Sequence, residues 1–477
     1  MKASSLNFAA LDLGASNGRT VLGRLHRGQL DIEVIHRFEH TARRADGHLR
    51  WDWPRICAGV DRGLASLAEA LGRETIASLS CDAWAQDFGL IDTDGRLVYS
   101  PVSYRDARSA RFPEGFFDRL DPQELMTRVG SGCLPIVTLC QLCAMAREEP
   151  EELARASRFL HVADLVHHRL CGEAATDWTL ATVSQLRNLQ TGLWDKELLE
   201  RMSVPTHILP RLQEAPAVLG AVLPERAPHP KLAGVPVVTV ANHDTAAASL
   251  AAAPLDRETI LLSVGTYAML GCTLDHPAVP DDAADRGYGL AGMGDRRWLL
   301  FYPVQGLWAI QECCRQWRKD GRAVGYEELV HRAGSATIDS VVPLSHPRFV
   351  APGNMPDEIR EACRERNLRE PCHRGEVARV VLNSLIRQYG DIISELSAMT
   401  GQRFQCIHLV SGGSQNAHLC QGLADAVGVR VLAGPVEAAA IGNILLQARL
   451  YGEMDDCAEI GRLLDRSFGR RSYEPRR

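Results

Sequence analysis

The sequence contains no long apolar run and no block of like charges. Its 477 residues carry a formal net charge of −6, and only 6% of them are aromatic. No stretch approaches the roughly 20 apolar residues of a membrane-spanning helix, and no basic block offers a surface for nucleic acid or anionic lipid. The amino-terminal stretch MKASSLNFAALDL also lacks an apolar segment long enough for a signal peptide. We therefore expect a cytoplasmic protein with no membrane partner and no nucleic-acid partner.

The fourteen cysteines lack the spacing of a disulfide framework or a zinc site. Cys140 and Cys143 form a C-x-x-C pair in VTLCQLCAMA, but no second pair and no histidine lies nearby in the sequence. Reduced thiols behave as small apolar groups. We expect the cysteines to serve in packing.

The first glycine-rich turn lacks the spacing of the common nucleotide-binding loops. The opening residues predict strands at 8–13, 19–25 and 30–38. The turn between the first two has no G-x-G-x-x-G spacing, precedes a strand and has no Walker lysine, which argues against a dinucleotide fold. It is either a plain hairpin turn or a turn that wraps phosphate oxygens, with Asp12 placed to hold Mg²⁺.

The stretch VVTVANHDTAAASLAAAPLDRETILLSVGTYAML, residues 237–270, combines an acid with a second glycine turn. It predicts a buried strand that ends at Asn242, followed by a helix over the alanine-rich residues 246–253. Asp244 at the amino end of this helix is either a helix cap or a carboxylate offered to a substrate. The Gly-Thr turn in ILLSVGTYAML leaves backbone N–H groups open to a phosphate.

A polar cluster, Asp82-Ala-Trp-Ala-Gln-Asp87, follows a helix predicted at 53–71 and a strand predicted at 76–83. Carboxylates accept hydrogen bonds from hydroxyl groups, and an indole covers the apolar side of a carbon chain. The cluster therefore suits a polyol.

The second half repeats the pattern of the first. After the hairpin in residues 237–270, a further strand is predicted at 298–304, so the second half has a strand–hairpin–strand order like that of residues 8–38. This similarity suggests an internal duplication. Residues 115–235 are predicted to be mainly helical. An amphipathic helix is predicted at 377–399 and a strand at 406–410. Glycines directly after that strand allow close approach of a flat ligand such as a purine.

Taken together, eight ordered motifs resemble the FGGY carbohydrate kinases, and within that family the L-rhamnulose kinases most closely. The motifs are DLGASNGR (12–19), DAWAQDFGL (82–90), PVSYRDAR (101–108), ANHDTAAA (241–248), LLSVGTYAMLG (261–271), QGLWAIQ (305–311), LVSGGSQN (409–416) and GPVEAAAIGN (434–443).

The resemblance implies an α/β fold of two ribonuclease-H-like domains of the actin and hexokinase type, with ATP and sugar in an interdomain cleft. We place the sugar-binding domain at residues 1–245 and the nucleotide-binding domain at 246–477. The implied activity is ATP-dependent phosphorylation of a ketose hydroxyl, with L-rhamnulose converted to L-rhamnulose 1-phosphate. The implied partners are a small ketose, ATP and Mg²⁺, and the implied assembly is a monomer or homodimer.

By the same resemblance, Asp244 is the catalytic base and belongs to a sugar-contacting triplet with His243 and Thr245. Asp87, Ala85 and Pro303 complete the predicted sugar site, and Asp12 is the predicted metal ligand. Ala85 stands where L-rhamnulose kinases have glycine, and Pro303 where they have a sugar-contacting asparagine. The residues expected at the ATP phosphates or the nucleotide are Ala15, Ser16, Asn17, Gly18, Arg19, Thr266, Gln311 and Gly412.

Three alternatives remain at this point. L-Fuculose or another ketose is the alternative substrate, because of Ala85 and Pro303. A catalytically silent sensor of sugar or nucleotide is disfavoured by the presence of Asp12 and Asp244. An actin-like ATPase without a sugar acceptor is disfavoured by the His-Asp-Thr triplet and the DAWAQDF motif.

Overall fold

The computed structural model describes residues 5–110, 115–132, 134–280, 282–350, 352–454 and 456–476. The chain divides into two compact units. Unit 1 comprises residues 1–254, 274–300 and 438–467, and unit 2 comprises residues 255–273, 301–437 and 468–477.

The strands and helices of unit 1 come from all three of its segments. They are β1 (Leu6–Leu13), β2 (Asn17–His26), β3 (Gln29–Glu39), β4 (Ala42–Ala45), β5 (His48–Trp51), α1 (Trp53–Ala70), β6 (Ser78–Ala83), β7 (Phe88–Ile91), α2 (Phe116–Arg119), α3 (Pro122–Val129), α4 (Thr138–Glu148), α5 (Pro150–Arg155), β8 (Arg158–His161), α6 (Val162–Cys171), β9 (Ala175–Asp177), α7 (Trp178–Val183), α8 (Lys196–Arg201), β10 (Arg211–Gln213), β11 (Ala217–Ala221), β12 (Pro236–Thr239), α9 (Asp244–Ala251), β15 (Gly289–Gly292), α15 (Ala438–Leu450) and α16 (Cys457–Phe468).

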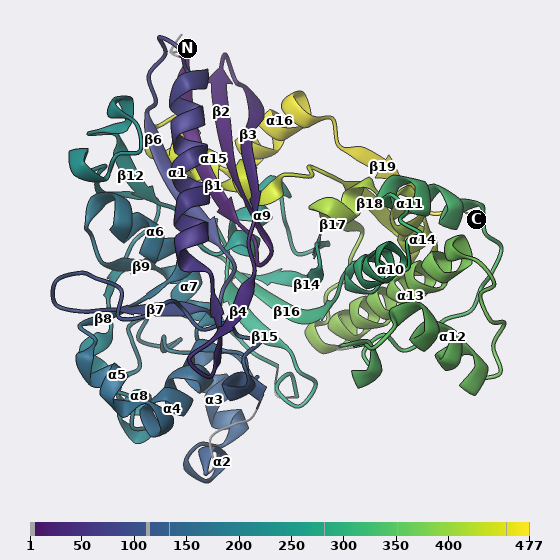
Figure 1. Ribbon diagram of the computed structural model, residues 1–477. Coiled ribbons are helices and arrows are strands. Elements are labelled where there is room, and N and C mark those ends of the chain that lie inside the picture. Colours follow the sequence, from purple (N-terminus) through teal and green to yellow (C-terminus); the bar gives the residue numbers. More distant parts are fainter. Residues whose placement is uncertain are drawn as a thin grey trace. The chain divides into compact units, whose positions relative to one another are not determined.

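The main sheet of unit 1 has the order β11-β12-β6-β1-β2-β3. Its central strands β1 and β6 are parallel and buried almost throughout, as expected for strands covered on both faces. Helix α1 lies along β2 and β3 (Figure 1). It begins where Asp52 accepts a hydrogen bond from the Arg55 amide, with Pro54 in its first turn.

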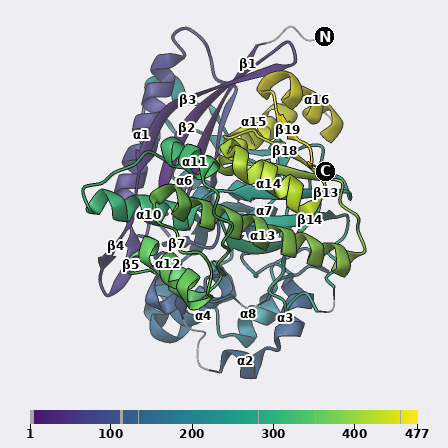
Figure 2. The same cartoon turned by 90° about the vertical axis from the view of Figure 1, so that its right-hand side faces the viewer.

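Unit 2 is built from β13 (Thr259–Val264), β14 (Tyr267–Leu274), β16 (Trp298–Gln305), α10 (Trp308–Lys319), α11 (Tyr326–Ser335), α12 (Met355–Glu365), α13 (Arg374–Thr400), β17 (Cys406–Val410), α14 (Ala417–Val427), β18 (Arg430–Ala433) and β19 (Arg471–Tyr473). Its strands lie in the order β16-β14-β13-β17-β18-β19. The long helix α13 packs against α10, α11, α12 and α14 (Figure 2). Gly401, with a φ of 69°, ends α13.

The two main sheets share one plan. In both, the first strand of an antiparallel hairpin (β1-β2 or β13-β14) pairs in parallel with a second strand (β6 or β17), which in turn pairs in parallel with a third (β12 or β18). An antiparallel edge strand, β11 or β19, closes each series. The similar order of strands in the two halves is therefore confirmed, whereas an internal duplication as its origin stays a prediction.

The predicted elements agree with the structure to within a few residues. The predicted strands at 8–13, 19–25 and 30–38 are β1, β2 and β3, and the helix predicted at 377–399 is α13. The region 115–235 contains helices α2 to α8, but it also contains short strands that the sequence reading passed over, among them the edge strand β11. Five residues rich in alanine and glycine carry little strand signal, and β11 forms because β12 offers it a partner.

The compact units do not follow a single cut of the chain. The division predicted at residues 245 and 246 stays a prediction about family domains, whereas contacts place residues 438–467 in unit 1. Helix α15 packs there against α9, β1 and β6 because its small residues allow close approach. The last helices of the chain therefore complete the amino-terminal unit.

Candidate functional site

Three aspartates and one arginine meet at the carboxyl ends of the central strands of unit 1. Asp12 on β1 lies in register with Asp82 on β6 and with Arg19 on β2. The Arg19 Nε lies 3.5 Å from the Asp12 Oδ2. The charges of Asp12, Asp244 and Arg19 all act on Asp82. The sheet register thus aligns three of these side chains, and the bridge between Ala83 and His243 brings Asp244 to the same end of β6.

Asp82 is fully buried and is held from α15. Its Oδ2 accepts a hydrogen bond of 2.7 Å from Asn443 Nδ2. Gln447, one turn further along α15, donates to the Asn443 Oδ1 and to the Ala9 carbonyl oxygen and accepts from the Ser78 hydroxyl. Burial, together with the charge of Asp12, raises the pKa of Asp82 well above its usual value. This ladder fixes the end of β6 and links it to β1.

Asp244 is the first residue of α9, but its carboxylate does not cap the helix. Its Oδ1 accepts hydrogen bonds from the amide (2.6 Å) and hydroxyl (3.1 Å) of the next residue, Thr245. The side chain is 30% exposed, so one side of the carboxylate is open. Burial of the rest raises the pKa of Asp244 to about 6, against the lowering effect of the Thr245 hydrogen bonds. A carboxylate with this pKa and an open side can act as a base near neutral pH.

His243 is positioned by a buried polar layer. Its amide donates to the Thr179 hydroxyl at 3.3 Å, and the Thr179 hydroxyl donates to Asp177. The preceding residue, Asn242, donates to Asp164 at 3.0 Å. Burial lowers the pKa of His243 to about 4, so its imidazole is neutral at pH 7. The turn that carries Asp244 is thus held by two carboxylates behind it.

Asp87 holds an aromatic cluster together. Its Oδ2 accepts hydrogen bonds from the indole N–H groups of Trp51 (2.6 Å) and Trp84 (2.9 Å), and the side chain is fully buried. Burial raises the pKa of Asp87 to about 6. In this arrangement the carboxylate orients Trp84, and its predicted contact with the sugar stays a prediction. Ala85, which follows Trp84, is half-buried against the same core.

The first glycine turn joins β1 to β2 and contains Ala15 and Ser16, whereas the other predicted phosphate residues, Asn17, Gly18 and Arg19, begin β2. Its ends are tied by the Gly14 amide, which donates to the Asn17 carbonyl oxygen at 2.9 Å. His40 Nε2 lies 2.9 Å from the Gly14 carbonyl oxygen, and its ring stacks on Trp84. Burial lowers the pKa of His40, which favours the neutral form of this ring. His40 therefore connects the predicted phosphate turn to the Trp84 cluster, a link that no motif indicated.

In unit 2, the residues predicted at the nucleotide gather at one sheet edge. Thr266 lies in the turn between β13 and β14, and its carbonyl oxygen accepts from the amides of Gly306 and Trp308. A side chain at Gly306 would overlap the Gly265 carbonyl oxygen, so this approach requires glycine. Gln311 follows within the first turn of α10, and Gly412 begins a short 3-10 helix after β17, the parallel neighbour of β13. Pro303 lies exposed on β16.

Several residues that support the site were not predicted from the sequence. His40, Asp164 and Asn443 come from segments far apart in the sequence, and only Asn443 lay within a recognised motif. Asp164 and Asn443 are polar residues within apolar sequence patterns, and this could have indicated buried hydrogen-bonding roles, because a buried polar group needs a partner.

The remaining sequence predictions concern metals and membranes. Cys140 and Cys143 lie buried in the core on α4, as predicted. Among the described residues, no three His, Cys, Asp or Glu side chains form a group that could by itself hold a metal ion. None of the helices described is both long and apolar enough to cross a membrane.

The fold matches solved structures of sugar kinases along nearly its full length. Gluconate kinase from Lactobacillus acidophilus superposes with a TM-score of 0.80 at 17% identity, covering 99% of this chain and 94% of the other. Xylulose kinase from the same organism gives a TM-score of 0.79 at 18% identity, covering 98% and 94%. The fold is thus that of the two-domain carbohydrate kinases.

Sequence comparison narrows this class to one family. The models of the FGGY family of carbohydrate kinases match residues 8–251 with the N-terminal domain and 260–451 with the C-terminal domain. The rhamnulokinase of Bacteroides thetaiotaomicron is 32% identical over 470 residues, which are 98% of this chain and 96% of that protein. The rhamnulokinase of Oceanobacillus iheyensis is 32% identical over 466 residues, 97% of each. The chain belongs to the FGGY family of carbohydrate kinases and is an ATP-dependent sugar kinase.

Proposed function

We propose that the protein transfers the γ-phosphoryl group of MgATP to the 1-hydroxyl of L-rhamnulose. The observation that carries the sugar assignment is the similarity to two rhamnulokinases over almost the whole chain. The assignment of the reacting group rests on Asp244, the open carboxylate at the start of α9.

Asp244 acts as the general base in this proposal. Its Oδ1 is engaged by Thr245, and a sugar hydroxyl donates to the open side of the carboxylate. The hydroxyl loses its proton to Asp244 as its oxygen attacks the phosphorus, a contribution of roughly 10²–10⁴-fold in rate. The neutral His243 beside it hydrogen-bonds the sugar without adding a charge.

The residues around Asp12 fit a magnesium ion bound together with ATP. Mg²⁺ is commonly held by one or two carboxylates, waters and substrate phosphates, so a single buried aspartate without a preformed cluster of three ligands is sufficient. When bound, Mg²⁺ would offset phosphate charge. The turn of Ala15 to Arg19 and the turn at Thr266 supply backbone N–H groups for phosphate oxygens, and Gln311 and Gly412 line the nucleotide.

Two positions bear on which ketose is used. Ala85 adds a methyl group beside Trp84, and Pro303 has no side-chain hydrogen bond to offer. A lost hydrogen bond to a sugar hydroxyl costs about 1–3 kcal/mol, which changes preference by ten-fold or more. This observation favours L-fuculose or another ketose as the second candidate substrate.

The test is ADP release from MgATP with a panel of L-rhamnulose, L-fuculose, L-xylulose and D-xylulose. We expect release only with sugar, and the highest kcat/KM with L-rhamnulose. ATP hydrolysis that is equally fast with and without sugar would contradict the kinase assignment of the site. A higher kcat/KM for another ketose would identify that ketose, and not L-rhamnulose, as the substrate. The double variant Ala85→Gly, Pro303→Asn, compared with wild type on the same panel, shows whether these two positions set the preference.

A further inference from the structure

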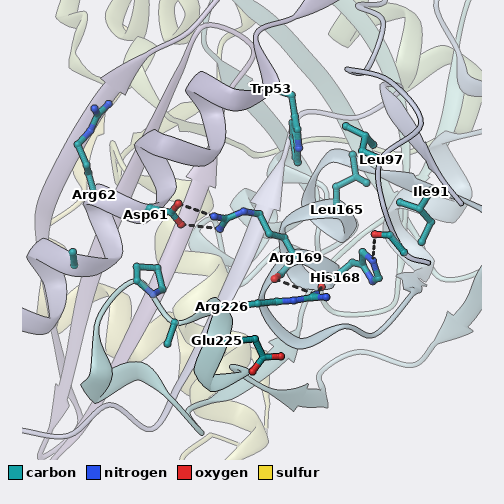
Figure 3. A pocket seen from close by; sticks show the side chains of 14 residues that line it. Trp53, Asp61, Arg62, Ile91, Leu97, Leu165, His168, Arg169, Glu225 and Arg226 are labelled. Atoms are coloured by element: carbon teal, nitrogen blue, oxygen red, sulfur yellow. Dashed lines mark hydrogen bonds and ion pairs between the residues drawn. The ribbon is translucent and has the colours of Figure 1, made fainter. Parts of the chain in front are cut away.

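A cavity of about 750 Å³ lies within unit 1, and none of the predicted site residues lines it. Its volume falls in the range of roughly 300–1,000 Å³ that is usual for small-molecule sites. Four segments form its walls: α1, the turn after β7, α6, and the 3-10 helix η3 (Pro224–Arg226) with the two residues that follow it (Figure 3).

One wall of the cavity is apolar and held in place. Trp53, Leu97 and Leu165 lie near one another on it (Figure 3). His168 fixes the turn, because its Nε2 lies 3.0 Å from the Gly95 carbonyl oxygen and its Nδ1 lies 3.0 Å from the Gly172 carbonyl oxygen. A half-buried indole in such a wall offers a flat surface to an apolar body.

The opposite side carries guanidinium groups. Arg169 forms a two-pronged ion pair with Asp61, at 2.7 and 2.6 Å. Arg226 is exposed and donates from one nitrogen to the carbonyl oxygens of His168 and Arg169, at the last turn of α6 (Figure 3). In the part of the chain that the structure describes, the partners of the Arg226 guanidinium are these two carbonyl oxygens and no carboxylate. Its other nitrogens can still donate to an anion.

We propose that this cavity binds a small organic anion. Its flat apolar body lies against Trp53, Leu97 and Leu165, and its phosphate or carboxylate group meets Arg226 and the neighbouring Arg169. Three arginines line the cavity against two carboxylates, so an anion and not a cation balances the charge. Arg169 is paired with Asp61, so a bound anion competes with the Asp61 carboxylate for the Arg169 guanidinium.

The cavity shares elements with the predicted sugar site. Trp53 is two residues beyond Trp51, whose indole holds Asp87, and Leu165 follows Asp164, which holds Asn242.

The experiment measures binding of 1-naphthyl phosphate to the full chain by calorimetry, in the absence of ATP and sugar. Its controls are 1-naphthol, which lacks the anion, and inorganic phosphate, which lacks the apolar body. 1-Naphthoate, in a parallel titration, distinguishes a carboxylate ligand from a phosphate ligand. We expect 1-naphthyl phosphate or 1-naphthoate to bind saturably and with higher affinity than 1-naphthol or inorganic phosphate.

Three variants decide whether the cavity is the site. Arg226→Gln should weaken binding about ten-fold, since a charge-assisted hydrogen bond is lost. Asp61→Asn should strengthen it, because Arg169 is then released to the probe. Arg73→Gln, an exposed arginine in the same unit and outside the cavity, should leave it unchanged.

The opposite signs expected for Asp61→Asn and Arg226→Gln separate binding in the cavity from general destabilisation, and thermal unfolding of each variant checks the fold. Absence of saturable binding would overturn the proposal. So would binding that ATP displaces and that Arg226→Gln and Asp61→Asn both leave unchanged, since the probe would then occupy the nucleotide site.

Discussion

At the scale of single residues, the properties of Asp244 follow from two neighbours and from burial. The Thr245 amide and hydroxyl stabilise the ionised carboxylate, while burial destabilises it, and burial has the larger effect. The balance leaves the pKa of Asp244 at about 6. The group is thus ionised at pH 7 and still basic enough to accept a proton.

Replacing Asp244 by Asn should leave ATP binding intact and lower kcat by roughly 10²–10⁴-fold, because the amide keeps the size of the side chain and loses its basicity. Single-turnover kinetics with a nucleotide titration would measure both. A variant that keeps more than about a tenth of the wild-type kcat would place the base elsewhere.

The pH dependence of kcat/KM tests the same residue. Since the base must be deprotonated, kcat/KM should fall as the pH decreases through about 6. Thr245→Val removes a hydroxyl that donates to the ionised carboxylate, so the pKa of Asp244 rises and the acid limb moves to higher pH. An acid limb that stays in place in Thr245→Val would mean that another group titrates.

At the scale of elements, helix α15 supports the reaction site from beneath. Gly442 lies where α15 crosses α9, and a side chain there would overlap the backbone carbonyl of Ala247. Asn443, the next residue, donates to Asp82. The crossing and the hydrogen-bond ladder together hold the strand ends and the start of α9.

Gly442→Ala should therefore destabilise the protein by at least about 2 kcal/mol, because backbone has to move. Gly390→Ala on α13 is the matched control: its methyl group meets only Val427 at 3.8 Å. That change should stabilise by about 0.5–1 kcal/mol through helix propensity. Denaturant unfolding of both variants measures the difference, and equal effects would refute the packing argument.

The buried pair of Asn443 and Asp82 gives a second test at this scale. Asn443→Leu leaves the Asp82 carboxyl group buried without its partner and should cost about 1–3 kcal/mol. Adding Asp82→Leu should recover part of that loss, since no buried carboxyl group then lacks its partner, while Gln447 keeps its hydrogen bonds to Ala9 and Ser78. A double variant whose loss equals the sum of the two single losses would show that the pair does not interact.

At the scale of the whole molecule, unit 1 is complete only when residues near the carboxyl end of the chain pack into it. Residues 438–467 supply α15 and most of α16, which follow all of the helices of unit 2. Without them, apolar surface on β1 and α9 would be exposed to water.

A fragment that ends at residue 437 should fail to form a cooperative unit 1. Thermal unfolding and near-ultraviolet circular dichroism of this fragment should show lost tertiary packing, whereas a chain that ends at residue 470 should keep it. A fragment of residues 1–437 that unfolds at the wild-type temperature would show that α15 is dispensable.

The sequence by itself determined the family, the hairpins that open the two sheets (β1-β2 and β13-β14) and the turns at Asp12, Asp244 and Thr266. These features are local, because alternating or continuous apolar runs and glycine turns specify strands and hairpins over a few residues. The resemblance of eight ordered motifs then identified the FGGY kinases, which the family models confirmed.

Only the tertiary structure decided which distant residues support that site. The register of β1 and β6 places Asp12 beside Asp82, and α15 brings Asn443 to Asp82 across 361 positions of sequence. His40 and Asp164 take their roles from partners 26 and 78 positions away, and Asp87 joins the neighbouring Trp84 to Trp51, which lies 36 positions away. Such contacts depend on how elements pack, and neither periodicity nor spacing along the chain encodes which buried donor meets which acceptor.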